Sequence, residues 1–191
     1  ILNSCDAKMY NNTLVNSTVC VSRSERSAVG DHFGWHPATG PDVEERDGHV
    51  FVNNLMVADA TLNRPHLFVW QRAMLCDRLR DPQFSAIDNN VYVKNGERRA
   101  MPLILWSPAQ NEQCITAMDS PEELNKILPG FEKNGILLTL QNVFLSPELD
   151  NYRTLPGFTG HTAAVLPPAE IQSLLKMQKR APVYVGAYPP R

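Results

Sequence analysis

The sequence repeats one motif three times, as Tyr10-Asn11-Asn12-Thr13-Leu14-Val15, Val52-Asn53-Asn54-Leu55-Met56-Val57 and Asp88-Asn89-Asn90-Val91-Tyr92-Val93. In each copy an Asn-Asn pair precedes a short apolar segment rich in strand-forming residues. The pairs lie 42 and then 36 residues apart, which suits strand-sized units joined by loops of variable length. Such repetition predicts a solenoid in which equivalent strands stack on one another. A weaker fourth copy is Gln141-Asn142-Val143-Phe144-Leu145.

Asparagines at equivalent positions of stacked strands can form an amide ladder, in which each side chain bonds to those above and below. The alternative is three unrelated turns, because Asn is common in turns. The Asn-Asn pair holds the same place before each β-rich segment, and this regularity favours the ladder.

Short strands are expected along most of the chain. The segments at 7–10, 13–15 and 18–21 are three to four residues long and are separated by polar corners. Further strands are expected within 49–57, at 67–70, 87–93 and 102–106, and in the C-terminal tail at 183–188. Buried parallel strands of this length need not alternate strictly between polar and apolar residues.

Two short helices are expected near the C-terminal end. Ser120 is a suitable N-cap, with Pro121 at the first helical position and Glu123 completing a capping box. Leu124, Ile127 and Leu128 would then face the core. The second helix is expected over 168–179, with Ile171, Leu174 and Leu175 on one face.

Composition limits the class of protein. The 191 residues suit about one domain, and 43% are hydrophobic. No apolar run reaches the roughly 18 residues needed to span a membrane. The net charge is −2 with both signs interspersed, so neither nucleic acid nor an anionic membrane is expected as a partner.

The four cysteines contain no CxxC spacing, which disfavours a structural zinc site. Two disulfides are possible, including one between Cys5 and Cys20, but mostly free, buried thiols are favoured. No metal and no cofactor is expected.

The chain starts at Ile1, almost inside the first repeat, without an initiator Met or a signal peptide. A first strand unit in this position would leave a bare sheet edge. We therefore expect a fragment or a processed chain in which upstream polypeptide or another chain covers the N-terminal strands.

The order of these elements resembles the C-terminal portion of a right-handed parallel β-helix protein of the pectate-lyase-like, carbohydrate-active kind. The resemblance rests on the repeats at 11–16, 50–55 and 88–93, on the strand ending at Trp106, and on Gly186-Ala187-Tyr188-Pro189. It implies an all-β, right-handed parallel β-helix (solenoid) fragment with two short helices near the C-terminal end. Residues 1–191 would be the C-terminal part of one β-helix domain, with a long inserted loop at 22–48 and a closing segment at 119–191.

Proteins of this group include hydrolases, lyases, esterases and non-catalytic binders, so the fold alone does not fix the chemistry. The resemblance implies a secreted or periplasmic protein whose partner is a glycan. Among the activities, a glycoside hydrolase is preferred over a polysaccharide lyase acting on a uronate-containing glycan. A non-catalytic glycan-binding or adhesive protein is the third alternative.

The loop at 23–49 carries the expected chemistry, since it holds three of the five histidines and one of the three tryptophans. Glycoside hydrolysis needs two carboxyl groups flanking the scissile bond, and the catalytic candidates are Asp31, His32, Glu44 and Glu45. Lyase chemistry would need a base and a cation that neutralises the uronate carboxylate. The expected substrate-binding residues are Trp35, His36, Arg23, Arg26, Arg46, His49, His66 and Arg72.

For each of these residues the competing interpretation is a structural one. A loop this rich in acidic and basic residues is often a solvated, salt-bridged cover. His49 suits a strand residue with a satisfied hydrogen bond, and Trp70 and Trp106 suit packing aromatics. A metal site at His32 and His36 is disfavoured because Gly34 and Pro37 oppose the helix that it would need.

Overall fold

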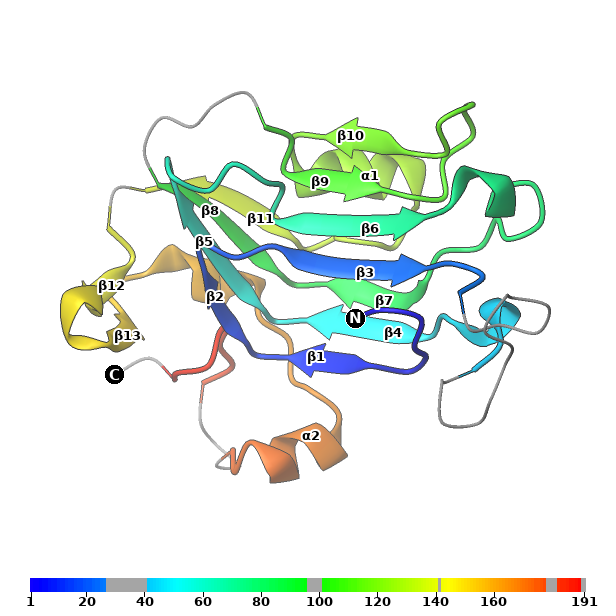
Figure 1. The fold of residues 1–191 in the computed structure, drawn as a ribbon. Helices are drawn as coiled ribbons and strands as arrows, with labels where there is room; N and C mark the ends of the chain where they lie inside the picture. The colour runs from blue at the N-terminus through cyan, green and yellow to red at the C-terminus, as the bar shows by residue number, and fades with distance from the viewer. Residues whose placement is uncertain (27–40, 96–100, 141, 178–181, 190–191) are drawn as a thin grey trace.

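The computed structural model describes residues 1–26, 41–95, 101–140, 142–177 and 182–189. Their regular structure is predominantly β, as expected, with two short α-helices within the described residues (Figure 1). The strands are β1 (Lys8–Tyr10), β2 (Thr13–Val15), β3 (Val19–Arg23), β4 (His49–Val52), β5 (Leu55–Asp59), β6 (Leu67–Gln71), β7 (Phe84–Asp88), β8 (Val91–Asn95), β9 (Ile104–Trp106), β10 (Thr116–Met118), β11 (Ile136–Thr139), β12 (Phe144–Ser146) and β13 (Asn151–Thr154).

The first nine strands enter three sheets in a repeating order. Sheet 1 has the order β1-β4-β7, sheet 2 the order β2-β5-β8-β11, and sheet 3 the order β3-β6-β9-β10. Within these three sheets neighbouring strands are parallel except for β9 and β10, whereas β12 and β13 form a separate antiparallel pair. Each set of three consecutive strands, here called a triplet, therefore gives one strand to each sheet. This topology is compatible with a parallel β-helix.

The second asparagine of each repeat forms the expected ladder between sheets 1 and 2. Asn12 Nδ2 donates to Asn54 Oδ1 at 2.8 Å, and Asn54 Nδ2 donates to Asn90 Oδ1 at 3.0 Å. The Nδ2 groups of Asn54 and Asn90 also donate to backbone carbonyls of the preceding triplet. Asn54 and Asn90 are fully buried, and these bonds offset the cost of burying their amides.

The first asparagine of each repeat has a different function. Asn11, Asn53 and Asn89 adopt positive φ values of 52°, 59° and 60°, a conformation that Asn tolerates better than most residues. Their side chains donate to carbonyls of the C-terminal segment, namely those of Tyr184, Val165 and Ala163 respectively. Each Asn-Asn pair therefore turns the chain and also binds the closing segment.

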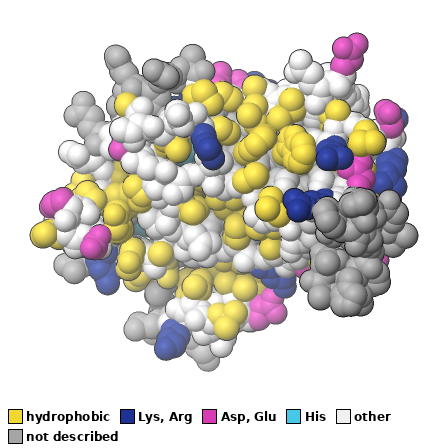
Figure 2. Space-filling model, in the orientation of Figure 1, with side chains coloured by type: hydrophobic (Ala, Val, Ile, Leu, Met, Phe, Trp, Pro, Cys, Tyr) yellow, Lys and Arg dark blue, Asp and Glu magenta, His cyan; other side chains and the backbone are white. Residues whose placement is uncertain are grey.

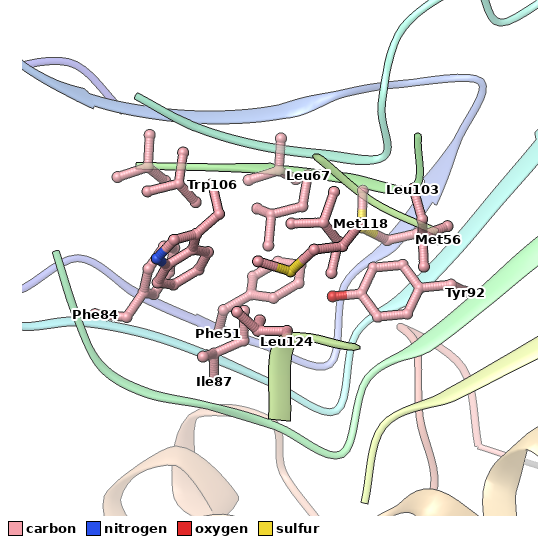
Figure 3. Packing of buried hydrophobic residues seen from close by; sticks show 14 residues of the cluster. Phe51, Met56, Leu67, Phe84, Ile87, Tyr92, Leu103, Trp106, Met118 and Leu124 are labelled. Carbon is pink, nitrogen blue, oxygen red and sulfur yellow. The ribbon is translucent and has the colours of Figure 1, made fainter. Parts of the chain in front are cut away.

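The core lies between the three sheets, and its large buried side chains come mainly from the second and third triplets (Figure 3). Trp106 is buried and stacks on Phe84 with ring centroids 5.9 Å apart. Trp106 is thus a core aromatic, as one interpretation of the sequence expected. Leu124 of α1 (Pro121–Ile127) closes the core at the end of the stack that carries β9 and β10.

The first helix begins and ends where expected, but both helices are less buried than expected and the second is shorter. Ser120 caps α1 and Glu123 Oε2 accepts from the Asp119 N–H, but Ile127 is exposed rather than core-facing. The second helix, α2, covers Ala169–Leu174 only. Leu174 is exposed there, so the expected apolar face is not buried in this structure.

Two expected strands were placed wrongly. The fourth rung of sheet 2 is β11, where Ile136 pairs with Val91, and not the segment beginning at Gln141. Asn134-Gly135 thus occupies the place of an Asn-Asn pair. The tail at 182–189 forms no strand; instead Gly186 N–H donates to Asn53 O and Ala187 N–H to Thr13 Oγ1.

The amide ladder ends on a buried carboxyl group. Glu132 Oε1 accepts hydrogen bonds from Asn90 Nδ2 at 2.8 Å and from Tyr92 Oη at 2.6 Å. Burial raises the pKa of Glu132 to about 7, although the bonds from Tyr92 and Asn90 oppose the shift. Burial also raises the pKa of Tyr92 well above its ordinary value.

Candidate functional site

Three connections leave the same edge of the molecule, because β3, β6 and β9 are parallel neighbours in sheet 3 (Figure 1). They span 24–48, 72–83 and 107–115. Loops on a rigid sheet scaffold are common places for binding and catalytic groups. The loop expected to carry the chemistry is the first of the three.

A pocket of about 940 Å³ lies between the second and third connections and the end of α1. It contains two carboxylates, Asp77 and Glu112, one cation, Arg80, and the amides of Gln110 and Asn111. No local sequence pattern distinguishes these residues. Only their position in the repeat could have indicated them. They follow the third strand of the second and third triplets, as the 22–48 loop follows the third strand of the first triplet.

A disulfide joins the two connections that form the pocket. Cys76 lies in its wall, and Cys114 is buried behind it. The expectation of free thiols is therefore correct for Cys5 and Cys20 and wrong for this pair. Gln71, at the end of β6, donates from Nε2 to Cys76 Sγ at 3.1 Å and to Leu79 O at 2.9 Å.

Arg23, an expected substrate-binding residue, is buried at the end of β3. Its Nε donates to Gln71 Oε1 at 2.6 Å, and its NH2 group donates to the carbonyls of Leu79 and Asp81 at 3.2 and 2.8 Å. Burial lowers the pKa of this guanidinium. Arg23 thus holds the second connection in place from inside the protein.

Arg46, also an expected substrate-binding residue, fastens the first connection. Its Nε donates to Pro41 O at 2.8 Å, and its NH1 group donates to the carbonyls of Ser24 and Arg26. Arg46 is fully buried, whereas Arg26 is exposed. The two ends of the 24–48 connection are therefore drawn together around one guanidinium.

The charged residues on the outside of these connections pair across them. Glu44 bonds to Arg78, and Arg72 lies 3.7 Å from Glu25. Glu45 is exposed in the 3-10 turn at 43–45. Because Arg78 follows Asp77 directly, Glu44 of the first connection contacts the second connection next to a residue that lines the pocket.

Two histidines among the expected substrate ligands, His49 in β4 and His66 just before β6, are buried. His49 Nδ1 accepts from the Ala7 N–H at 3.2 Å, and burial lowers the pKa of its ring. The expectation of a satisfied strand histidine is therefore confirmed. His66 Nε2 lies 3.4 Å from Val93 O, and its ring contacts Tyr92 edge-on. The other four predicted residues, Asp31, His32, Trp35 and His36, lie outside the described residues.

Hydrophobic side chains, two of them aromatic, lie on the outer face of sheet 3 (Figure 2). On β6 the side chains alternate, so that Leu67, Val69 and Gln71 are buried while Phe68 and Trp70 point outward and are half-buried. Cys20 and Leu105 flank Phe68 in register. The part of this face around Phe68 is therefore largely apolar.

Within the described ranges, no group of three or more His, Cys, Asp or Glu side chains is arranged to hold a metal ion. In that same part of the chain, no helix is long and apolar enough to cross a membrane. The sequence matches no protein-family model and no curated protein, and the structure matches no solved structure.

Proposed function

We propose that the chain belongs to a right-handed parallel β-helix protein of the pectate-lyase-like kind and is a secreted or periplasmic glycoside hydrolase. The repeating parallel triplets and the amide ladder support the β-helix. The disulfide supports an oxidising compartment, because such bonds persist outside the cytosol.

The observation that carries the hydrolase proposal is the presence of Asp77 and Glu112 in one pocket of about 940 Å³. Glycoside hydrolysis uses one carboxylic acid to protonate the leaving oxygen. A second carboxylate, on the opposite face of the sugar ring, activates a water molecule or attacks the sugar as a nucleophile. The neighbouring amides and Arg80 suit sugar hydroxyls as hydrogen-bonding partners. In this proposal Glu44 of the 24–48 connection lies beside the site, because it pairs with Arg78, the residue after the pocket residue Asp77.

The non-catalytic alternative has its own observation. Phe68 and Trp70 on the outer face of sheet 3 offer apolar ring surfaces on which sugar rings can stack. A binding protein would use this face without needing a pair of carboxylates.

A screen of plant and host polysaccharides separates the activities. We expect new reducing ends without an unsaturated product that absorbs in the ultraviolet. Asp77→Asn and Glu112→Gln should each lower turnover by about 10²- to 10⁴-fold. Glu122→Gln, on α1 outside the pocket, is the control and should retain activity.

Other outcomes reassign the function. An unsaturated product would indicate a lyase, and binding without cleavage that is lost in Trp70→Ala would indicate a glycan-binding protein. Asp31→Asn and Glu44→Gln belong in the same series, since both remain candidate catalytic residues. A loss confined to these two variants would move the site to the 24–48 connection.

A further inference from the structure

The end of the stack formed by β1 and β2 has an open edge. Within the described residues, β1 pairs only with β4 and β2 only with β5. In sheet 3 a single parallel bridge, from Leu2 to Ser22, continues the stack beyond β3. The opposite end is closed by the antiparallel strand β10 and by α1 (Figure 1).

The backbone hydrogen bonds between triplets show which donor group this edge presents. Leu55 N–H donates to Asn12 O at 2.8 Å, Val91 N–H to Asn54 O at 2.8 Å, and Ile136 N–H to Asn90 O at 3.0 Å. Thr13 N–H holds the corresponding place in the first triplet. It therefore points away from β5, toward the open edge.

The asparagine ladder also leaves a hydrogen-bond acceptor at this edge. Asn54 Oδ1 receives the backbone N–H and Nδ2 of Asn12, at 3.0 and 2.8 Å. Asn90 Oδ1 receives the same two groups of Asn54. Asn12 Oδ1 is the next acceptor in this series, and Asn12 is exposed.

The apolar columns inside the stack also stop at this end. Met9 is in register with Phe51, and Leu14 with Met56. Phe51 and Met56 are fully buried, but Met9 and Leu14 are only half-buried. Nearby, Lys8 Nζ binds Glu170 Oε1 at 3.0 Å, so α2 begins beside β1, and its Leu174 is 77% exposed.

We propose that the β1–β2 edge docks an extended polypeptide segment of the strand–Asn–Asn–strand type, lying parallel to β1 and β2. The segment's second Asn donates its backbone N–H and Nδ2 to Asn12 Oδ1, and its carbonyl accepts from Thr13 N–H. Its apolar side chains cover Met9 and Leu14. This occupant continues the interface that already joins each triplet to the next, and it is independent of the glycan proposal.

A second folded copy of this chain fits the edge less well. Its own open edge would meet this one in antiparallel orientation under two-fold symmetry, and the ladder requires parallel strands in register. Its other end is closed by α1 and β10, which disfavours head-to-tail stacking.

The test uses a capped, fluorescently labelled peptide with the sequence of residues 49–59, which forms β4 and β5. We expect saturable binding, and slowed amide exchange at Thr13 in the complex. Asn12→Ala should weaken binding by about tenfold, because two hydrogen bonds are lost at an exposed site. A peptide with both asparagines changed to Ala is the matched control and should bind more weakly by a similar factor.

Circular dichroism of Asn12→Ala establishes that the variant is folded, so that weaker binding reports on the edge. Equal binding of the peptide and its double-Ala control would overturn the ladder contact. No saturable binding, or a dimer whose mass doubles without peptide in light scattering, would overturn the proposed occupant.

Discussion

Asn54 donates both its backbone N–H and its Nδ2 to the single oxygen Oδ1 of Asn90, at 2.9 and 3.0 Å. Both residues are fully buried, so this pair joins two triplets by polar contacts that are shielded from solvent. A buried amide with all its bonds satisfied fixes register, because a shift by one residue would leave several groups unpaired.

Asn54→Ala should therefore lower the free energy of unfolding by about 2–3 kcal/mol, because Asn90 Oδ1 and a carbonyl of β1 lose donors. Asn12→Ala at the exposed end of the ladder is the control and should cost less than about 1 kcal/mol. Urea unfolding followed by circular dichroism measures both. Equal losses in the two variants would show that burial of the ladder does not determine its contribution.

Glu132 should make stability depend on pH. Its pKa is about 7 in the folded protein against an ordinary 4.5, because burial disfavours the ionised form. Between these values the folded state holds a proton that the unfolded state has released. The free energy of unfolding should therefore fall as pH rises from about 4.5 to 7, by about 3 kcal/mol for this group.

The comparison that isolates this effect is Glu132→Gln, which keeps an oxygen acceptor for Asn90 and Tyr92 and cannot ionise. Denaturant titrations at several pH values between 4.5 and 7.5 should give a shallower pH dependence for the variant. If both proteins lose the same stability across this range, the buried carboxyl is not the group that titrates.

Arg23→Met should destabilise the second connection. It leaves Gln71 Oε1 and the carbonyls of Leu79 and Asp81 without their cationic donor, at a cost of about 2–4 kcal/mol. Arg72→Met removes the half-exposed pair with Glu25 at 3.7 Å and should cost less, about 1 kcal/mol. Thermal unfolding compares the stability of the two variants. A larger loss of stability for Arg72→Met than for Arg23→Met would contradict the structural function given to Arg23.

Thiol labelling tests the cysteine pairing. Under denaturing, non-reducing conditions two cysteines, Cys5 and Cys20, should react with iodoacetamide, and all four should react after reduction. The bond closes a separation of 38 residues, so Cys76→Ser with Cys114→Ser should cost about 3–4 kcal/mol in a chain-entropy account. Four reactive thiols before reduction would rule out the bond.

The sequence predicted the parts of the fold that repeat. The Asn-Asn pairs precede three segments that do stack in parallel, and the amide ladder is present in the expected register. The repeat was informative because each copy must satisfy the same hydrogen bonds. Where Asn134-Gly135 replaces the pair, the signal is lost, and the sequence places the fourth rung seven residues too late, at Val143 instead of Ile136.

The site was less predictable, because the same residue types serve inside and outside the protein. Arg23, Arg46 and His49 were selected for their chemistry, but all three are buried and bond to neighbouring groups of the scaffold. Asp77 and Glu112 have no distinguishing local pattern. The parallel order of β6 and β9 and the disulfide between Cys76 and Cys114 bring their connections together around one pocket.

The most direct test of the proposed function is a crystal structure of the protein with an oligosaccharide selected by the polysaccharide screen. We expect sugar rings in the pocket between the connections at 76–80 and 108–112, in contact with Asp77 and Glu112. Sugar bound instead on the outer face of sheet 3, against Phe68 and Trp70, would contradict the hydrolase proposal and favour a glycan-binding protein.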